Sequence, residues 1–341
     1  MKKISVIIPV YGVEKYIGEA IESVLLQTHD ALEIIIVDDS SPDRSIEICQ
    51  QFTDSRIRII HQKNRGLAGA RNTGIRHATG DFIAFLDGDD LWLPQKLEKH
   101  IEHLETNPKI GISYSASDFI NEQGEFLGTS QNPKLKQITL ADLLRENVVG
   151  NGSSAVVRRE VLEEIKYQDS IDGTSEDFYF DEQFRQAEDI EFWIRVAIQT
   201  NWQLEGIPEK LTLYRVNAGG LSANLFKQLE YTEKLIEKIR SYAPEIISKW
   251  ENLLRAYNLR YLARSAVRRK DNLLAIQMIH RAIWMDWRII TEQPRRTLLT
   301  LVAAYVLWLV PQVIYCRLEE LISSIKKSMK KFPVLQNQMG Q

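Results

Sequence analysis

Short apolar runs alternate with amphipathic stretches over the first hundred residues of the chain. The apolar runs predict strands at residues 4–10, 32–37, 57–61 and 82–86. The stretches between them have apolar side chains on one helical face, which predicts helices at residues 14–27, 44–52 and 70–78. Strands that alternate with helices at this spacing indicate an α/β fold with a mostly parallel sheet and right-handed crossovers.

Beyond residue 90 the pattern becomes less regular. Asp90 is expected to cap a helix at 91–105, and an Asn-Glu-Gln-Gly turn at 121–124 predicts an antiparallel hairpin that continues to Phe126. Further elements are expected as short strands at 110–114, 117–120 and 211–215, a short helix at 140–146, and a loop that enters a strand by Val157. The segment from Tyr167 to Phe180 is interpreted either as a mobile loop or as plain surface disorder.

The rest of the chain is expected to be nearly all helical. Helices are predicted at residues 225–243, 244–269 and 273–287. We therefore predict one domain at 1–220, with a first half at 1–105 and a second half at 106–220. A helical C-terminal region at 221–341 follows it.

The net charge of −3 is the sum of a long acidic part and a shorter basic part. Residues 1–254 hold 28 Lys and Arg against 41 Asp and Glu, a balance of −13, whereas residues 255–341 hold 15 against 5, a balance of +10. The basic part contains a hydrophobic segment without charge at 297–316, and a basic tail follows it with Lys326, Lys327, Lys330 and Lys331. Two hypotheses fit this composition: peripheral contact with an anionic membrane through 295–331, or a helix packed on the catalytic domain with a solvated tail.

The two cysteines, Cys49 and Cys316, lie far apart in apolar surroundings, which indicates reduced thiols. The apolar start of the chain is interrupted by Pro9 and then by charges, so it is interpreted as a strand and not as a signal peptide. We expect a cytoplasmic protein at the inner face of the plasma membrane.

The candidate chemistry follows three strands of the predicted sheet. Asp87 and Asp89 follow the fourth strand, and the glycine between them lets the backbone approach a ligand closely, so they could offer two hard oxygen ligands to a divalent cation. An acidic cluster in this position is also typical of a helix cap, and that alternative stays open. Other residues complete a candidate nucleotide site at the same edge, namely Pro9 and Tyr11, Asp38 and Asp39, and the cation Arg71. Taken alone, each of these residues also fits a structural role: Tyr11 in the core, Asp38 and Asp39 as caps of the next helix, and Arg71 in a surface ion pair.

Four motifs in order resemble the inverting family 2 glycosyltransferases with the GT-A fold. They are V-I-I-P-V-Y at 6–11, D-D-S-S at 38–41, N-x-G-x-x-x-A-R-N-x-G at 64–74, and A-x-G-x-F-I-x-F-L-D-x-D-D at 78–90. The resemblance covers about residues 1–220 and implies a nucleotide-binding half at 1–105 and an acceptor half at 106–220, with the loop at 167–180 on the acceptor side. It also implies that Tyr11 and Asp39 contact the nucleotide base. It further implies that Asp87 contacts the ribose or the metal and that Asp89 binds the metal, Mn²⁺ or Mg²⁺.

A fifth motif, E-D-x-x-x-W-x-R, begins at Glu188. Two acids at a helix start are stabilised by the helix dipole whatever their function. The resemblance implies that Asp189 is the catalytic base and that Glu188 orients the acceptor or the base. The chain departs from the family at two positions. Gly12 stands where Asn is usual, and Asn217 stands where His is usual. The second departure leaves a third protein ligand to the metal in doubt.

The sequence therefore predicts a metal-dependent, inverting glycosyltransferase that uses a nucleotide-sugar donor, with a UDP-sugar favoured. The acceptor is expected to be a glycan or a lipid-linked sugar in cell-surface polysaccharide assembly, and no nucleic acid is expected as a partner. A sugar-1-phosphate nucleotidyltransferase is the alternative enzyme, but it should show a Gly-rich phosphate loop after the first strand, and residues 11–15 offer none. A nonenzymatic scaffold or carbohydrate-binding module is the third hypothesis; it predicts no role for Asp89 or Asp189.

Overall fold

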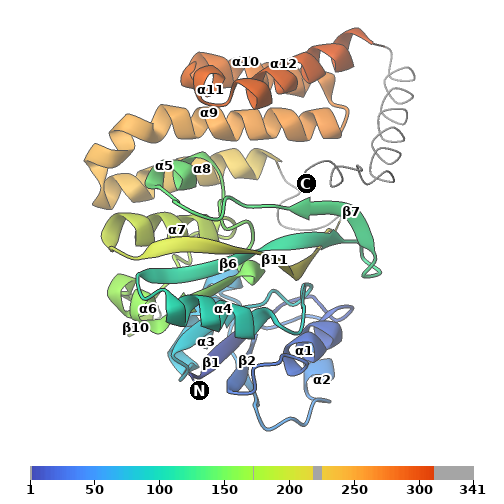
Figure 1. Ribbon diagram of the computed structural model, residues 1–341, viewed down its shortest axis with the longest axis vertical. Helices are drawn as coiled ribbons and strands as arrows, with labels where there is room; N and C mark the ends of the chain where they lie inside the picture. The colour runs from blue at the N-terminus through green and yellow to red at the C-terminus, as the bar shows by residue number, and fades with distance from the viewer. Residues whose placement is uncertain (1, 172, 218–224, 311–341) are drawn as a thin grey trace, which may run out of the picture. The chain divides into compact units, whose positions relative to one another are not determined.

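The computed structural model describes residues 2–171, 173–217 and 225–310. The chain divides into two compact units, Met1–Ile247 and Ser248–Gln341. The first unit contains a sheet with helices on both faces, and the second is helical (Figure 1).

The sheet of the first unit has the strand order β3-β2-β1-β4-β8-β6-β11-β5, and β7 pairs with β6. The first four strands in this order are parallel, whereas β8 runs antiparallel to both β4 and β6. The strands are β1 (Ile4–Val10), β2 (Leu32–Asp38), β3 (Ile57–His61), β4 (Phe82–Phe85), β5 (Leu91–Trp92), β6 (Ile110–Ile120), β7 (Phe126–Gln131), β8 (Ala155–Arg158) and β11 (Gln203–Arg215). The α/β order predicted for the first hundred residues is thus confirmed.

Helices cover both faces of the sheet, so β1, which is apolar on both sides, is fully buried. Ile4, Val6, Ile8 and Val10 share one hydrophobic core with residues of α1 (Ile17–Leu25) and α4 (Lys96–Thr106). Ile7 points to the other face, where Gly74 of α3 (Gly66–His77) comes so close that a Cβ on that glycine would lie 2.3 Å from Ile7 Cγ2. The remaining helices of this unit are α2 (Ser45–Cys49), α5 (Leu140–Arg145), the 3₁₀ turn η1 (Gly152–Ser154), α6 (Arg159–Ile165), α7 (Glu188–Gln199) and α8 (Leu225–Tyr242).

The helix predicted from Leu91 was wrong at its start. Leu91 and Trp92 form β5, which pairs with Leu213 and Thr212 of β11, and α4 begins only at Lys96. Asp90 therefore does not cap that helix. It is buried and accepts hydrogen bonds from Ser153 Oγ at 2.6 Å and from the Arg215 N–H at 2.9 Å.

Two further predictions were wrong in their detail. The short strands expected at 110–114 and 117–120 form one continuous strand, β6. The expected loop from Tyr167 to Phe180 is largely a two-stranded hairpin of β9 (Tyr167–Ile171) and β10 (Thr174–Phe178).

The helical unit confirms the helices predicted beyond residue 243. They are α9 (Pro244–Arg268), which begins in the first unit, and α10 (Asn272–Met285). Two further helices follow, α11 (Arg288–Glu292) and α12 (Pro294–Leu309). The hydrophobic segment 297–316 is described only to residue 310, and Lys326, Lys327, Lys330 and Lys331 lie outside the described residues. Within the described residues, each helix is too short or too polar to cross a membrane.

Candidate active site

The carboxyl ends of β1 and β2 carry the residues predicted to contact a nucleotide base. Pro9 lies in β1 opposite Val37 of β2, and the Tyr11 side chain that follows is 54% exposed. Asp39 follows β2, and its N–H donates to the Val10 carbonyl oxygen at 3.1 Å, which joins the two strand ends. These residues therefore lie at one edge of the sheet, with the Tyr11 ring open to a ligand.

The Asp39 carboxylate holds the segment that leads into α3. It accepts hydrogen bonds from Gln62 Nε2 at 2.6 Å, the Arg65 N–H at 2.7 Å and the Gly66 N–H at 2.8 Å. Burial raises the pKa of Asp39, although these hydrogen bonds act in the opposite direction. The structure thus gives Asp39 a local role as an acceptor, and its contact with a nucleotide base stays a prediction.

Three carboxylates lie in sequence after β4, in different surroundings. Asp87 accepts from Arg71 Nη2 at 2.7 Å, and Asp89 accepts from Asn217 Nδ2 at 2.8 Å. Burial and the neighbouring Asp87 carboxylate raise the pKa of Asp89 to about 6. Burial, with Asp89 and Asp87, raises the pKa of Asp90 well above its usual range. The fold thus holds Asp89 where its negative charge is unfavourable without a cation beside it.

Arg71 is the residue that joins the two ends of the candidate site. Its side chain is 1% exposed, and its Nη1 atom donates to Glu188 Oε1 at 2.7 Å while Nη2 donates to Asp87. The guanidinium also lies over the rings of Phe85 and Phe180, with its Cζ 5.6 and 5.5 Å from their centroids. The structure therefore pairs Arg71 with two carboxylates, and its predicted contact with a diphosphate stays a prediction.

Glu188 and Asp189 open α7, as the sequence predicted. Burial raises the pKa of Glu188 to about 7, because the Asp189 and Asp87 carboxylates offset part of the opposing effect of Arg71. Burial also raises the pKa of Asp189, against the Arg71 charge and a 2.9 Å hydrogen bond from Asn147 Nδ2 to its Oδ2 atom. The residue before the pair, Ala187, has φ 60°, a backbone conformation that costs energy and occurs mainly where the fold requires it.

Several residues of this edge were not singled out by the sequence. Asn147 positions Asp189, and Ser153 accepts from the Asp87 N–H at 3.0 Å while donating to Asp90. Arg215, left unassigned from sequence, donates to the Asp89 carbonyl oxygen at 2.8 Å and to Glu19 Oε2 at 2.7 Å. Asn147 lies in an irregular segment and Ser153 in the three-residue turn η1, and neither has a periodicity that could have marked these residues in the sequence.

The donor atoms around Asp89 fit a divalent cation. Among the described residues, no group of three or more His, Cys, Asp and Glu side chains could hold a metal ion. However, Asn217 Oδ1 is buried and has no hydrogen-bond partner in the described part of the chain, although its amide nitrogen contacts Asp89. A buried amide oxygen without such a partner, on a side chain that contacts the Asp89 carboxylate, is a hard oxygen ligand of the kind that Mg²⁺ and Mn²⁺ prefer.

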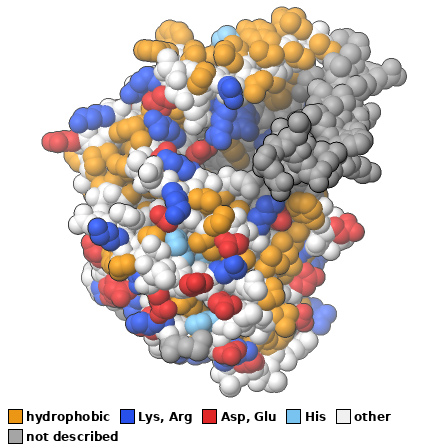
Figure 2. Space-filling view, viewed as in Figure 1, with side chains coloured by type: hydrophobic (Ala, Val, Ile, Leu, Met, Phe, Trp, Pro, Cys, Tyr) orange, Lys and Arg blue, Asp and Glu red, His pale blue; other side chains and the backbone are white. Residues whose placement is uncertain are grey.

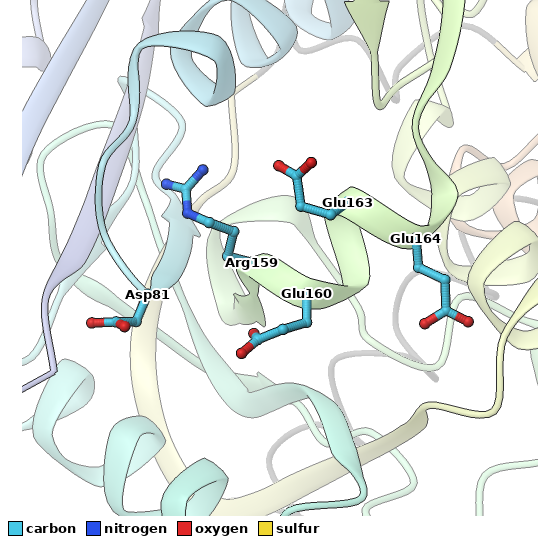
Figure 3. Close-up of a pocket in the computed structure, with 5 residues that line it drawn as sticks. All are labelled: Asp81, Arg159, Glu160, Glu163 and Glu164. Carbon is cyan, nitrogen blue, oxygen red and sulfur yellow. The ribbon is translucent and has the colours of Figure 1, made fainter.

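A surface pocket lies away from this edge. Its volume is about 490 Å³, and it is lined by Asp81, Arg159, Glu160, Glu163 and Glu164 (Figure 3). Asp81 precedes β4, whereas Asp87 follows it, so the pocket lies toward the opposite end of that strand. With four carboxylates and one arginine, this pocket is poorly suited to a diphosphate.

Comparison with known proteins identifies the family. Residues 5–166 match the sequence model of Glycosyl transferase family 2. A protein of Escherichia coli, UDP-Glc:alpha-D-GlcNAc-diphosphoundecaprenol beta-1,3-glucosyltransferase WfgD, is 31% identical over 228 residues, which are 67% of this chain and 82% of that protein. The chain belongs to glycosyltransferase family 2. Membership of a family that transfers glycosyl groups favours the predicted enzyme over the nucleotidyltransferase and over the nonenzymatic module.

Other relatives are matched over a smaller part of their length. An uncharacterized glycosyltransferase of Rickettsia felis is 37% identical over 64% of this chain and 33% of that protein. One of Nostoc is 38% identical over 48% of this chain and 53% of that protein. This family 2 glycosyltransferase thus spans about a third to a half of these relatives.

Solved structures confirm the fold. TarS of S. aureus, residues 1–349 in complex with UDP-GlcNAc, has a TM-score of 0.59 at 18% identity over 89% of each chain. The mannosyltransferase PcManGT of Pyrobaculum calidifontis, in complex with GDP-Man and Mn²⁺, has a TM-score of 0.53 at 18% identity over 89% of this chain and 86% of that chain. The likeness confirms a GT-A α/β sheet followed by a helical C-terminal region.

Proposed function

We propose that this chain is a metal-dependent, inverting glycosyltransferase that moves a sugar from a nucleotide-diphosphate donor to a hydroxyl group of a glycan or lipid-linked acceptor. The proposed setting is assembly of cell-surface polysaccharide on the cytoplasmic side. The supporting observation is the Arg71 bridge, which joins Asp87 after β4 to Glu188 at the start of α7. Residues expected to bind the donor and residues expected to activate the acceptor thereby lie in one site.

A UDP-sugar is the favoured donor. The name of the E. coli relative includes UDP-Glc, and it is 31% identical to this chain. At the edge formed by β1 and β2, the exposed Tyr11 ring offers a surface on which a base could stack, beside Pro9 and Asp39. A guanosine or thymidine diphosphate sugar would use the same ring, so the nucleotide is a matter for direct measurement.

Asp189 is the proposed general base. An acceptor hydroxyl attacks well only when a carboxylate takes its proton as the new bond forms, which contributes about 100- to 10,000-fold in rate. Asn147 fixes the carboxylate through Oδ2, and the Ile190 N–H donates to Oδ1 at 2.9 Å. Burial moves the pKa of Asp189 upward, toward the pH at which the enzyme works, and a general base is most effective when its pKa lies near that pH.

The other residues of the site control charge. Asp87 and Asp89, with Asn217, would hold Mn²⁺ or Mg²⁺, and the bound ion would stabilise the charge that develops on the leaving diphosphate. Arg71 keeps Asp87 and Glu188 in fixed positions. The proposed role of Glu188 is to orient the acceptor or the base. A single base on the acceptor side is consistent with direct displacement, which inverts the anomeric carbon and needs no covalent intermediate.

A donor-binding and turnover assay tests this proposal. Calorimetry against UDP-, GDP- and thymidine diphosphate sugars, with and without Mn²⁺, would identify the donor, and release of the nucleoside diphosphate would report turnover. Asp89→Asn is expected to weaken metal-dependent donor binding about tenfold or more, because it removes one anionic ligand. Asp189→Asn is expected to leave donor binding unchanged and to lower turnover about 100-fold or more.

Asp81→Asn is the matched control, because Asp81 and Asp87 stand at opposite ends of the same strand. It should leave both donor binding and turnover near the wild-type values. If no nucleotide sugar binds with either cation, or if Asp189→Asn turns over at the wild-type rate, the proposed site is wrong. Diphosphate release from a nucleoside triphosphate and a sugar 1-phosphate would instead support the nucleotidyltransferase.

A further inference from the structure

Helix α12 exposes most of its large apolar side chains and buries two threonines. The residues that it buries are Thr297, Thr300, Ala304 and Leu307. On the outside, Leu299 is 69% exposed, Leu309 67%, and Val302 57%; Leu298 and Trp308 are about half exposed. Soluble helices normally show the opposite arrangement, so the outward face of α12 is built to contact something apolar.

The neighbouring helix extends this apolar surface. Trp284 of α10 is 94% exposed, and Trp287, between α10 and α11, is 65% exposed. His280 lies on the exposed side of α10, and its Nε2 atom is 2.8 Å from the Tyr305 hydroxyl oxygen of α12. The two helices therefore meet beside this surface. Figure 2 shows hydrophobic side chains gathered over α10 and α12, along the upper edge of the view. The α10–α12 apolar face is defined here as Trp284, Trp287, Leu298, Leu299, Val302 and Leu309.

The charges around the α10–α12 apolar face are mainly positive. Residues 272–310 contain four arginines and two carboxylates, and no charged residue follows Arg296 in α12. The four arginines, Arg281, Arg288, Arg295 and Arg296, are exposed, and Glu292 is the exposed acid of these residues. Asp286 is buried and forms a 2.5 Å ion pair with Arg288, so Arg281, Arg295 and Arg296 carry the excess positive charge. An apolar face with a cationic rim is complementary to a surface that is apolar within and anionic outside.

We propose that the α10–α12 apolar face binds the surface of an anionic phospholipid bilayer, with α12 lying in the plane of the interface. Leucine and valine side chains would enter the acyl boundary, and the indole rings of Trp284 and Trp287 would lie at the headgroup level, where tryptophan is favoured. The arginines would contact lipid phosphates. Thr297, Thr300 and Ala304 are buried against the protein, so only the opposite face of α12 can contact lipid. The helix would therefore lie parallel to the membrane surface.

A second copy of the chain fits this face less well. Two copies joined through the α10–α12 apolar face would bring two arginine rims together, and like charges repel. An anionic lipid surface neutralises the same rim. The inference goes beyond the proposed transfer reaction, since it concerns the helical unit and not the residues of the candidate active site.

Vesicle sedimentation of the full chain tests the proposal. The protein should sediment with vesicles that contain phosphatidylglycerol and much less with vesicles of phosphatidylcholine alone. The double variant Leu299→Ser, Val302→Ser should lower the partition coefficient about tenfold or more, because it removes apolar surface. The double variant Arg281→Ala, Arg295→Ala should lower it about tenfold on anionic vesicles only.

Leu26→Ser provides the matched control. Leu26, at the end of α1, is 68% exposed, nearly the same as Leu299 at 69%, but it lies in the other unit. Partition of Leu26→Ser should equal that of the wild type. Equal partition onto neutral and anionic vesicles, or unchanged partition of either double variant, would overturn the proposal. A dimer in solution that Leu299→Ser, Val302→Ser converts to a monomer, without vesicle binding by the wild type, would assign the face to a second copy instead.

Discussion

The position of the Arg71 guanidinium depends on a glycine beside it. A Cβ added at Gly152 would lie 2.2 Å from Arg71 Nη2 and 3.0 Å from its Cζ. The buried guanidinium is held by Asp87 and Glu188, so it cannot move aside without loosening one of them. We expect Gly152→Ala to lower turnover about tenfold or more, since small displacements of catalytic groups are costly. Steady-state kinetics with the identified donor, together with the melting temperature, would measure this effect.

Gly18→Ala is the control for the Gly152 prediction. A Cβ at Gly18 of α1 would meet only Ile48 Cγ2, at an ordinary contact distance of 3.7 Å. Alanine is favoured over glycine in a helix by about 0.5–1 kcal/mol, so this variant should be as stable as the wild type or more so, with normal turnover. Normal turnover in Gly152→Ala as well would show that the Arg71 bridge does not position the catalytic groups.

At the scale of single residues, the sequence predicted the carboxylates of the site better than their partners. Asp87, Asp89 and Asp189 follow predictable strands or open a predictable helix, so their local position was readable from the pattern. The partner of Asp189, Asn147, is 42 residues away in an irregular segment. The double pairing of Arg71 requires α3, β4 and α7 to meet, and nothing in the local sequence of Arg71 specifies that contact.

Among the elements, Glu33 ties three segments together at the amino ends of the parallel strands. From its position on β2, it accepts from Ser5 Oγ of β1 at 2.6 Å, from Lys3 Nζ at 3.0 Å and from the Thr79 N–H before β4 at 2.7 Å. Burial alone would raise the pKa of Glu33, but these hydrogen bonds outweigh it and lower the pKa to about 2. We expect Glu33→Gln to lower the free energy of unfolding at pH 7 by about 1–2 kcal/mol, after allowance for solvent screening.

The pH dependence of this effect follows from the lowered pKa. The ionised Glu33 contributes stability above pH 4.5, its usual pKa, and that contribution is lost as the pH falls toward about 2. As the pH falls between these limits, the free energy of unfolding from urea curves should therefore decrease more steeply for the wild type than for Glu33→Gln. Glu47→Gln is the control, because the Glu47 side chain is 66% exposed and its ion pair with Arg44 should contribute little. Parallel curves for wild type and Glu33→Gln would contradict the prediction.

Elements were predicted well where their pairing is local and poorly where it is distant. The strands β1 to β4 are short apolar runs in repeating units, and all four were recognised. In contrast, β5 is two residues long and pairs with β11, about 120 residues later, so its local sequence does not mark it as a strand. Only the end of β11 was recognised, because register shifts around Ile207 and Lys210, with Pro208 between them, interrupt the alternation of a strand.

On the scale of the whole chain, the sequence predicted a boundary at residue 220, whereas the compact units divide after Ile247. The difference is α8, which the periodicity alone could not assign to either part. Lys238 of α8 forms a 2.6 Å ion pair with Asp181, whose side chain is only 5% exposed, and its Nζ lies 5.2 Å from the Tyr167 ring centroid. Ile236 and Ile239 of the same helix are fully buried. The helix is therefore an integral part of the sheet-containing unit.

A comparison of two shortened chains tests the role of α8. We expect a chain that ends at Ile247 to fold and to bind the donor nucleotide, because it retains every residue of the candidate active site. A chain that ends at residue 220 should be several kcal/mol less stable, since it leaves Asp181 buried without its cation and exposes the surface under Ile236 and Ile239. Urea unfolding followed by circular dichroism, with calorimetry for donor binding, would measure both properties. Equal stability of the two chains would show that α8 belongs energetically to the helical unit, and the boundary predicted from the sequence would then describe the folding units better.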